Sequence, residues 1–411
     1  MSNSPTIERI PFQSLRSRTR GDKVIWTAVF LLAIVSLLVV YSSTGLLAYK
    51  MYKGNTEIYL FKQFAFIVAG VAIIYFAHQV NYTIYSRVAT ILFLVSIPLL
   101  LYTLFFGVKL NEGSRWIRLP IINMTFQTSD LAKLALFMYL SRLLSKKQDV
   151  IKDFREGFLP VITPVAIICL LVAPANLSTA LLIGATSLIL LFIGRVSARH
   201  LLLSVAVAAV PVLILIGAAM LRHHSNNDAT EKPRSEGHSG LFVRVDTWIS
   251  RVEAFIYGGG DSEDNNYQTN QAKIAIAKGG FLGLGPGNSQ QRNFLPHPYS
   301  DFIYAIIIEE YGMVGAVLIA LIYLIFLLRS IRIFRRCPFA FGAFLALGLS
   351  FTLVIQALAN MAVNVNLFPV TGVTLPLVSM GGSSFLFTCL AIGIILSVAR
   401  NVEQLEGSAS E

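Results

Sequence analysis

The feature that most constrains this chain is a series of apolar runs, each about 20 residues long, that recurs along its whole length. A helix of that length can cross the hydrocarbon core of a bilayer. Only 13% of the residues are charged, whereas a soluble domain carries roughly 25%. The pattern predicts an all-α polytopic membrane protein and excludes an ordinary soluble domain.

The apolar runs predict about ten transmembrane helices, and the basic residues between them predict the orientation. With the N-terminus in the cytoplasm, the short inner segments collect most of the arginines and lysines, as the positive-inside rule requires. The net charge of +11 therefore suits a membrane surface, and no nucleic acid partner is expected. The predicted spans are 24–44, 59–78, 86–106, 128–144, 157–174, 178–194, 199–221, 302–328, 341–363 and 383–399.

This topology divides the chain into five parts and places both termini in the cytoplasm. A long extracytoplasmic loop separates the seventh and eighth helices. The parts are a basic tail (1–23), helices 1–7 (24–221), the loop (222–300), helices 8–10 (301–399) and a second tail (400–411).

Three irregular segments fall on the outer side under this orientation: 107–127, the loop 222–300, and 364–382. Non-helical backbone at membrane depth is tolerated only where it lines a cavity or packs within protein. These segments therefore predict a site that opens to the outer face. The same rule applies to Pro160 and Pro164 in the fifth span, which we expect to be kinked or broken.

Acidic residues open the eighth span, in the stretch "FLPHPYSDFIYAIIIEE". Asp301 lies at the outer boundary, and Glu309 and Glu310 follow about two turns further in. A carboxylate that faces lipid costs several kcal/mol, so the glutamates must face a cavity, pair with a partner or be protonated. A structural role and a functional role are both open for them. Asp301 needs no burial and adjoins the other irregular segments.

Cationic and aromatic residues on the outer side form a second group of candidates. The stretch "GSRWIRLP" places Arg115, Trp116 and Arg118 at the boundary, where a tryptophan is often only an aromatic-belt anchor. Together with Arg251 and Lys278, the arginines could hold an anionic headgroup, because an arginine fork matches phosphate oxygens.

Two weaker signals have a structural alternative. Lys133 follows Asp130 at i+3 in the fourth span, and such a pair commonly neutralises itself within a helix. The stretch "GGFLGLGPGN", residues 279–288, could present backbone N–H groups to phosphate, but it lacks the Gly-Lys-Ser/Thr of a P-loop. A set of tight turns at the membrane surface is the alternative for this stretch.

Four stretches together resemble the signatures of the SEDS family, which includes FtsW and RodA: "FLPHPYSDFIYAIIIEEYG", "PVTGVTLPLVSMGGSS", "GSRWIRLP" and "FQTSDLAKLAL". The resemblance implies a SEDS-type fold in the bacterial inner membrane and a peptidoglycan glycosyltransferase that polymerises lipid II, with its active site on the extracytoplasmic face. It also implies a class B penicillin-binding protein (a transpeptidase) and other divisome membrane proteins as partners.

The resemblance also implies roles for individual residues. Asp301 matches the essential loop aspartate, Trp116 the outer-loop tryptophan, and Lys133 the lysine of the motif "QPSELAK". Further matches, in the long loop and the C-terminal loop, are Arg251, Gln268, Gln271, Thr371, Gly372, Pro376, Ser379, Gly381, Gly382, Ser383 and Ser384.

The chain departs from the family pattern at two places. "QTSDLAK" has Thr128 and Asp130 where the motif has proline and glutamate, and "PANLSTA" has Asn176 where many members have an acid. The basic N-terminal tail and the wording "NVNLFPVTG" favour the division branch, similar to FtsW. An elongation polymerase similar to RodA is one alternative, and a lipid II transporter is another, because intramembrane acids and a broken helix also suit transporters.

The implied reaction joins the 4-hydroxyl of one GlcNAc to the anomeric carbon of a lipid-linked MurNAc and releases undecaprenyl pyrophosphate. Inversion requires a base on the attacking side and stabilisation of the leaving group on the other. We expect Asp301 to be the base, strengthened by a partly dry pocket. Arg251, Lys278 or Arg118, with Mg²⁺ or Mn²⁺, would hold the pyrophosphate. Alternatively, Asp301 binds the metal. No organic cofactor is expected.

Overall fold

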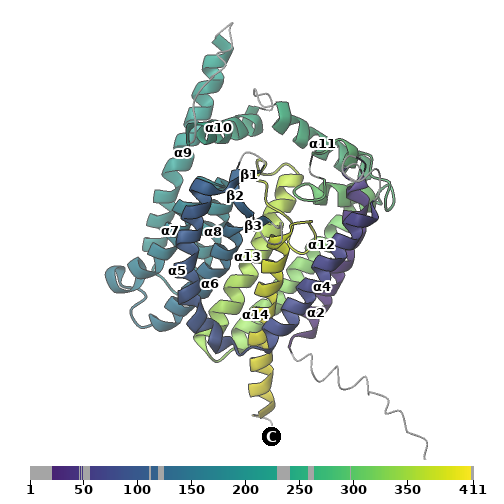
Figure 1. Ribbon diagram of the computed structural model, residues 1–411. Helices are drawn as coiled ribbons and strands as arrows, with labels where there is room; N and C mark the ends of the chain where they lie inside the picture. Colours follow the sequence, from purple (N-terminus) through teal and green to yellow (C-terminus); the bar gives the residue numbers. More distant parts are fainter. Residues whose placement is uncertain are drawn as a thin grey trace, which may run out of the picture.

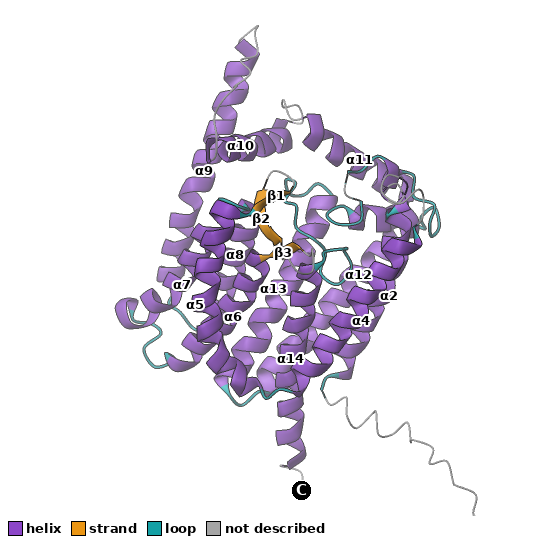
Figure 2. Cartoon of the chain, in the orientation of Figure 1, coloured by secondary structure: helices purple, strands orange, loops and turns teal. Residues whose placement is uncertain are grey.

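The computed structural model describes residues 21–45, 47, 49, 56–110, 113–118, 125–228, 241–257, 263–296 and 298–408. It forms a helical bundle with two further helices lying across one end (Figures 1 and 2). Each of the ten predicted spans corresponds to a helix. These are α2 (Lys23–Ser43), α4 (Glu57–Gln79), α5 (Tyr82–Phe106), α6 (Thr128–Lys146), α7 (Leu159–Val172), α8 (Leu177–Ile193), α9 (Ala198–Asp228), α12 (Ile303–Arg336), α13 (Ala340–Asn364) and α14 (Ser383–Ser408).

Eight helices in the described ranges are long and apolar enough to cross a membrane, when α7 is counted together with the π-helical turn η1 (Phe154–Phe158) that precedes it. The other two are α8, which is apolar but has 17 residues, and α6, which carries Asp130, Lys133 and Arg142 along its 19 residues. The polytopic, helical fold expected from the sequence is therefore confirmed.

The core of the bundle is built around α13, which packs against α6, α8, α12 and α14. No charged residue occurs in α13, and 83% of its most apolar window is buried within the protein. By contrast, only 6% of the corresponding window of α9 is buried, so α9 lies at the periphery. The residues at the C-terminal end of α13 are therefore held by the best-packed helix of the described bundle.

The two ends of the bundle differ in chemistry. At one end, Asp22 caps α2 and forms an ion pair of 2.7 Å with Arg329, while Gly21 N donates to Glu403 Oε2 on α14 at 2.9 Å. Gly21 and Asp22 thus lie against α12 and the C-terminal part of α14. The opposite end carries α10 (Leu241–Tyr257), α11 (Glu263–Gly279) and a small sheet (Figure 2).

The outer segments contain more regular structure than the sequence predicted. Segment 107–127 forms an antiparallel sheet in the order β1 (Val108–Leu110), β2 (Gly113–Arg118), β3 (Thr125–Gln127). Helix α9 continues to Asp228, beyond the predicted end of the seventh span at residue 221, and its candidate membrane-spanning part is Ala198–Leu221. Between α9 and α12 the structure contains two further helices, α10 and α11.

Backbone irregularities also occur within the predicted spans. Helix α7 starts at the π-helical turn and continues through Pro164, with Pro160 in its first turn, where proline is tolerated. The eighth span, predicted as one continuous helix, is instead broken at Gly312, whose φ and ψ are 65° and −166°. The break separates the first turns of α12, which follow Asp301, from its long remainder.

Candidate active site

Asp301 lies in the turn that leads into α12, and α13 holds it through its main chain. Its backbone carbonyl accepts hydrogen bonds from Asn360 Nδ2 and Asn364 Nδ2, both at 2.9 Å. The residue is half-buried, and its Oδ1 accepts a hydrogen bond from Ser300 Oγ at 3.1 Å. The peptide of Asp301 is therefore fixed by a rigid helix, while the residue as a whole is only half-buried.

The C-terminal loop is tied to the same turn. Ser379 Oγ donates to Ser300 O at 2.6 Å and accepts from Leu375 N at 2.8 Å. Met380 N donates to Tyr299 O at 3.0 Å. The segment before Asp301 and the loop that carries the proposed substrate-binding residues thus form one hydrogen-bonded unit.

The pKa of Tyr299 reflects the surroundings of this hydrogen-bonded unit. Burial raises the pKa of the Tyr299 phenol above its usual value of 10.0, and the Asp301 carboxylate raises it further. A phenol with a raised pKa stays neutral at physiological pH. Tyr299 is therefore a neutral phenol near the Asp301 carboxylate.

Lys133 reaches this unit from α6 through one intervening side chain. Its Nζ lies 3.2 Å from Asp130 Oδ1, so the predicted i+3 pair is confirmed. The same Nζ also donates to Gln356 Oε1 on α13 at 2.7 Å, and Gln356 Nε2 donates to Thr374 O at 3.0 Å. Lys133 thus links α6 to the C-terminal loop, a contact that the sequence did not predict.

The small sheet connects Trp116 to the beginning of α14. Trp116 is half-buried and pairs with Gln127 across β2 and β3. Gln127 N donates to Ser383 Oγ at 3.1 Å, and the Phe126 ring packs edge-on against Phe387, with ring centroids 5.4 Å apart. Trp116 is therefore placed beside the start of α6 and the end of the C-terminal loop.

Two other candidates of the C-terminal loop have different surroundings. Ser384 lies in the first turn of α14, and its carbonyl accepts the Thr388 hydroxyl at 3.0 Å. The buried Thr371 hydroxyl has no hydrogen-bond partner in the described part of the chain.

The long-loop candidates lie at the same end of the bundle but on separate helices. Arg251 is on α10, and Gln268 and Gln271 are on α11, which packs against α12 and α13. These two helices lie across the end that carries the sheet (Figure 1). No hydrogen bond in the described segments joins Gln268 or Gln271 to the Asp301 carboxyl, so their predicted roles stay predictions. The side chains of Arg115 and Arg118 lie outside the described residues.

The glycine-rich stretch uses its backbone N–H groups within the protein. Leu284 N and Gly285 N donate to the carbonyls of Glu309 and Glu310, both at 2.9 Å, and Met313 N donates to Gly280 O at 3.1 Å. The stretch therefore fills the break of α12 with a set of tight turns. These bonds support the alternative to a phosphate cradle. Beside it, exposed Lys278 Nζ donates to Gln290 Oε1 at 2.7 Å.

The two glutamates after Asp301 have protein partners. The fully buried Glu309 carboxylate accepts the Ser289 hydroxyl and the N–H groups of Gln290 and Gln291 at 3.0 and 3.2 Å. Glu310 accepts the hydroxyl of Ser42 on α2. Of the two roles left open by the sequence, these contacts support the structural one.

Sequence reasoning missed three amide side chains on α13. Gln356, Asn360 and Asn364 bind the backbone of the two outer loops, as described above. Their spacing of four residues in an otherwise apolar helix places them on one face. That spacing is the signal that could have identified them.

Comparison with known proteins places the chain in a family. The family model described as a cell cycle protein, for FtsW, RodA and SpoVE, matches residues 22–404. The chain belongs to this SEDS family. It is 32% identical over 394 residues to the probable peptidoglycan glycosyltransferase FtsW of Geobacter sulfurreducens, which covers 93% of this chain and 96% of that relative.

Other SEDS relatives match over similar lengths. The stage V sporulation protein E of Bacillus subtilis is 31% identical, over 93% of this chain and 98% of the relative. Among solved structures, a chain from a study of polymerization and crosslinking by a peptidoglycan synthase complex matches with a TM-score of 0.68 and 22% identity, covering 93% of this chain and 99% of that one.

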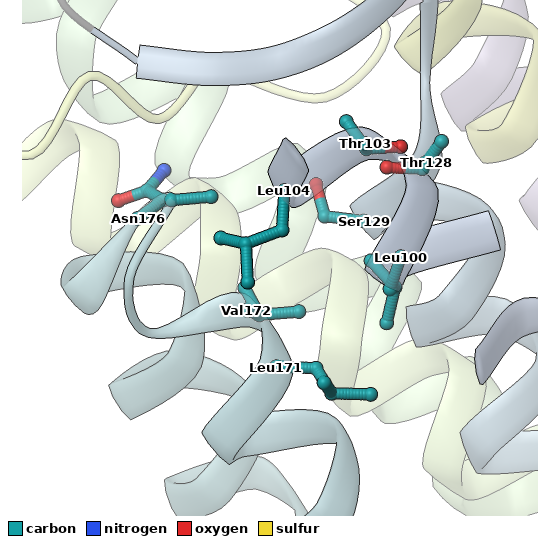
Figure 3. A pocket seen from close by; sticks show the side chains of 9 residues that line it. Leu100, Thr103, Leu104, Thr128, Ser129, Leu171, Val172 and Asn176 are labelled. Atoms are coloured by element: carbon teal, nitrogen blue, oxygen red, sulfur yellow. The ribbon is translucent and has the colours of Figure 1, made fainter. Parts of the chain in front are cut away.

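Two residues that depart from the SEDS pattern line the same pocket. Thr128 and Asn176 both contribute to a small cavity of about 10 Å³ beside the start of α6. In the close-up, Asn176 and Thr128 lie on opposite sides of Leu104 (Figure 3). Asn176 Oδ1 caps α8 by accepting from Thr179 N at 3.3 Å, so the amide keeps a structural use at this position. The pocket is lined by Leu100, Thr103, Leu104, Thr128, Ser129, Leu171, Val172, Ala175 and Asn176.

Proposed function

We propose that this SEDS protein is a peptidoglycan glycosyltransferase that polymerises lipid II at the outer face of the bacterial inner membrane during cell division. The observation that carries the proposal is the junction at Asp301. One half-buried carboxylate is fixed there by its backbone, where the C-terminal loop, the start of α12 and the outer end of α13 meet. The name of the Geobacter relative supports the reaction and the division branch.

In this proposal Asp301 is the general base. The 4-hydroxyl oxygen of the acceptor GlcNAc attacks the anomeric carbon of the donor MurNAc while the bond from that carbon to the pyrophosphate breaks. The hydroxyl proton passes to the Asp301 carboxylate, and undecaprenyl pyrophosphate leaves as an anion. A base positioned by rigid secondary structure is the arrangement that such a transfer requires. The lipid anchor of both sugars accounts for a site at the end of a membrane bundle.

The leaving anion requires positive charge on the opposite side of the sugar. Lys133 is held next to the C-terminal loop by Gln356, and Arg251 and Arg118 come from the outer segments. We propose that these cations stabilise the pyrophosphate. Trp116, Gln268, Gln271 and the hydroxyls of Thr371, Ser379, Ser383 and Ser384 are proposed to contact the substrate.

A metal role for Asp301 is the alternative to the base role. No group of three or more His, Cys, Asp or Glu side chains gathers within the described ranges. A single carboxylate still fits Mg²⁺ or Mn²⁺, because Mg²⁺ is commonly held by one or two carboxylates together with substrate phosphates. When bound, the ion would neutralise charge on the pyrophosphate.

The proposed partner is a class B penicillin-binding protein, within an assembly of other divisome membrane proteins. The chain resembles one that was studied in a peptidoglycan synthase complex, which supports a partnered enzyme in general. Co-purification from the host tests this proposal. A division-specific transpeptidase should accompany the protein, whereas an elongation-specific one would assign it to the RodA-like branch.

The reaction is tested with purified protein, its transpeptidase partner and lipid II in liposomes. Polymerisation and lipid II scrambling are measured on the same preparation, for wild type and for Asp301→Asn. We expect wild type to make glycan strands and Asp301→Asn to lose about 10²–10⁴-fold in rate, the usual contribution of a general base. Near-normal polymer from the variant would exclude both roles of Asp301. Scrambling without polymerisation would identify a transporter.

A further inference from the structure

Three amide side chains on α13 form a ladder that faces the outer loops. Gln356, Asn360 and Asn364 follow one another at intervals of four residues, so they lie on one face of the helix. All three are buried, with 8%, 1% and 1% of their surface exposed. A buried amide is costly unless it is hydrogen-bonded. What these amides bind therefore indicates what they do.

Asn360 is the middle of this amide ladder and joins two loops. Its single Nδ2 group donates to Asp301 O at 2.9 Å and to Val373 O at 2.7 Å. An amide nitrogen carries two hydrogens, so both are used, one for each loop. No aliphatic side chain of similar size could make this connection.

Asn364 fixes the same turn at a second point. Its Nδ2 donates to Asp301 O at 2.9 Å, and its Oδ1 accepts from Ala305 N at 3.0 Å. Ala305 lies in the first turn of α12, and its N–H also donates to Phe302 O at 3.1 Å. The backbone is thus held on both sides of the point at which the Asp301 side chain leaves it.

Gln356 extends the ladder toward the cation of the site. It accepts from Lys133 Nζ at 2.7 Å and donates to Thr374 O at 3.0 Å, next to the carbonyl that Asn360 binds. The ladder thus connects Lys133, the C-terminal loop and Asp301 to the most buried helix of the bundle.

We propose that Asn360 and Asn364 are positioning residues of the glycosyl transfer, which set the Asp301 carboxyl relative to the C-terminal loop. This inference rests on the proposed function, because it requires Asp301 to act in the reaction. Misplacing a catalytic group by about 1 Å can cost about 10²-fold in rate. Loss of the ladder therefore lowers kcat and leaves the affinity for lipid II intact.

The test compares Asn360→Ala and Asn364→Ala with the matched control Asn366→Gly. Asn366 lies two residues beyond Asn364, has no side-chain hydrogen bond in the described structure and has a φ of 61°, which glycine adopts readily. For each variant, kcat and KM of polymerisation are measured, together with the stoichiometry and Kd of lipid II binding in detergent. The binding stoichiometry reports the folded, competent fraction.

We expect kcat to fall about 10–100-fold in both alanine variants, with stoichiometry, Kd and KM within about threefold of wild type. Asn366→Gly should behave as wild type. An unchanged kcat, or a fall in kcat matched by an equal fall in stoichiometry, would overturn the inference, because the amides would then only support folding. Should Asn360→Ala yield no folded protein, Asn360→Ser, which keeps one donor, replaces it with a smaller expected fall.

A parallel Asp301→Asn preparation separates the two levels of the proposal. If it retains activity, the proposed function of Asp301 fails, whatever the asparagine variants do. If it is inactive while Asn360→Ala and Asn364→Ala turn over normally, only the positioning role fails.

Discussion

Asp301 and Glu309 lie on the same short segment, eight residues apart, yet the protein holds them in opposite ways. Asp301 is held by its backbone carbonyl, and its half-buried carboxyl accepts from the neighbouring Ser300. Glu309 is held by its carboxylate, which is fully buried and accepts the Ser289 hydroxyl and two backbone N–H groups. This difference distinguishes Asp301, an acid positioned for catalysis, from Glu309, an acid whose hydrogen bonds support the structure.

The surroundings of the two acids differ in the same sense. Around Asp301, side-chain amides of α13 bind loop carbonyls, so the loops are held in an irregular, non-helical shape. Around Glu309, the glycine-rich stretch 279–288 binds α12 backbone to backbone across the break at Gly312. The first region presents functional groups, whereas the second closes a gap in the bundle.

The largest expected effect comes from making the same change, carboxylate to carboxamide, in both regions. Asp301→Asn should lose about 10²–10⁴-fold in polymerisation rate without a change in its thermal unfolding in detergent. Glu309→Gln should show the reverse, because an amide offers one acceptor oxygen in place of two to the Ser289 hydroxyl and the two N–H donors. We expect a loss of about 1–3 kcal/mol in stability, with activity per folded molecule retained. Equal effects of the two variants on both measurements would contradict the comparison.

Next in size is the close packing at the break of α12. A Cβ on Gly312 would overlap the carbonyl of Phe281, and φ there is 65°. We expect Gly312→Ala to cost roughly 2–5 kcal/mol from overpacking and backbone strain together. Gly287→Ala is the control, since Gly287 also has positive φ but nothing lies within 4 Å of its Cβ position. Unfolding midpoints that fall equally in both variants would assign the whole effect to φ.

The sequence predicted features that depend on neighbouring residues, and it did not predict features that depend on contacts between residues far apart in the chain. The spans and the position of Asp301 depend on local composition, so they were predictable. The hydrogen bonds that hold the Asp301 backbone were not predictable. Asn360 lies 59 residues further along the chain and binds a carbonyl, a group that every residue type has. Likewise, the break at Gly312 depends on a loop about 30 residues earlier in the chain. A glycine in an apolar run does not by itself indicate that a distant loop packs against it.

The lysines allow a finer test of the same contrast, because one lies in each region. Lys133→Met removes the donor to Gln356 and leaves the buried Asp130 without its cation. We expect about a tenfold loss of polymerisation rate, equivalent to about 1.4 kcal/mol in the barrier, together with some loss of stability. Gln356→Leu separates the two causes, since it breaks the link to Thr374 and keeps the ion pair. If Gln356→Leu keeps full activity, the link is not what Lys133 supplies.

Lys278 gives the smallest expected effect, although the sequence made it a candidate for binding the pyrophosphate. It lies at the end of α11 beside the glycine-rich stretch, is exposed, and donates to Gln290 on the same surface. A surface contact of this kind contributes little, so Lys278→Met should change stability by no more than about 0.5 kcal/mol. Its rate and KM for lipid II should stay within about threefold of wild type. The substitution matches Lys133→Met, so the two variants together test whether a lysine charge matters only where it is linked to the C-terminal loop. The contrary result is a rise in KM with Lys278→Met as large as the rate loss with Lys133→Met. It would show that the anion reaches the glycine-rich stretch. That stretch would then belong to the functional region around Asp301.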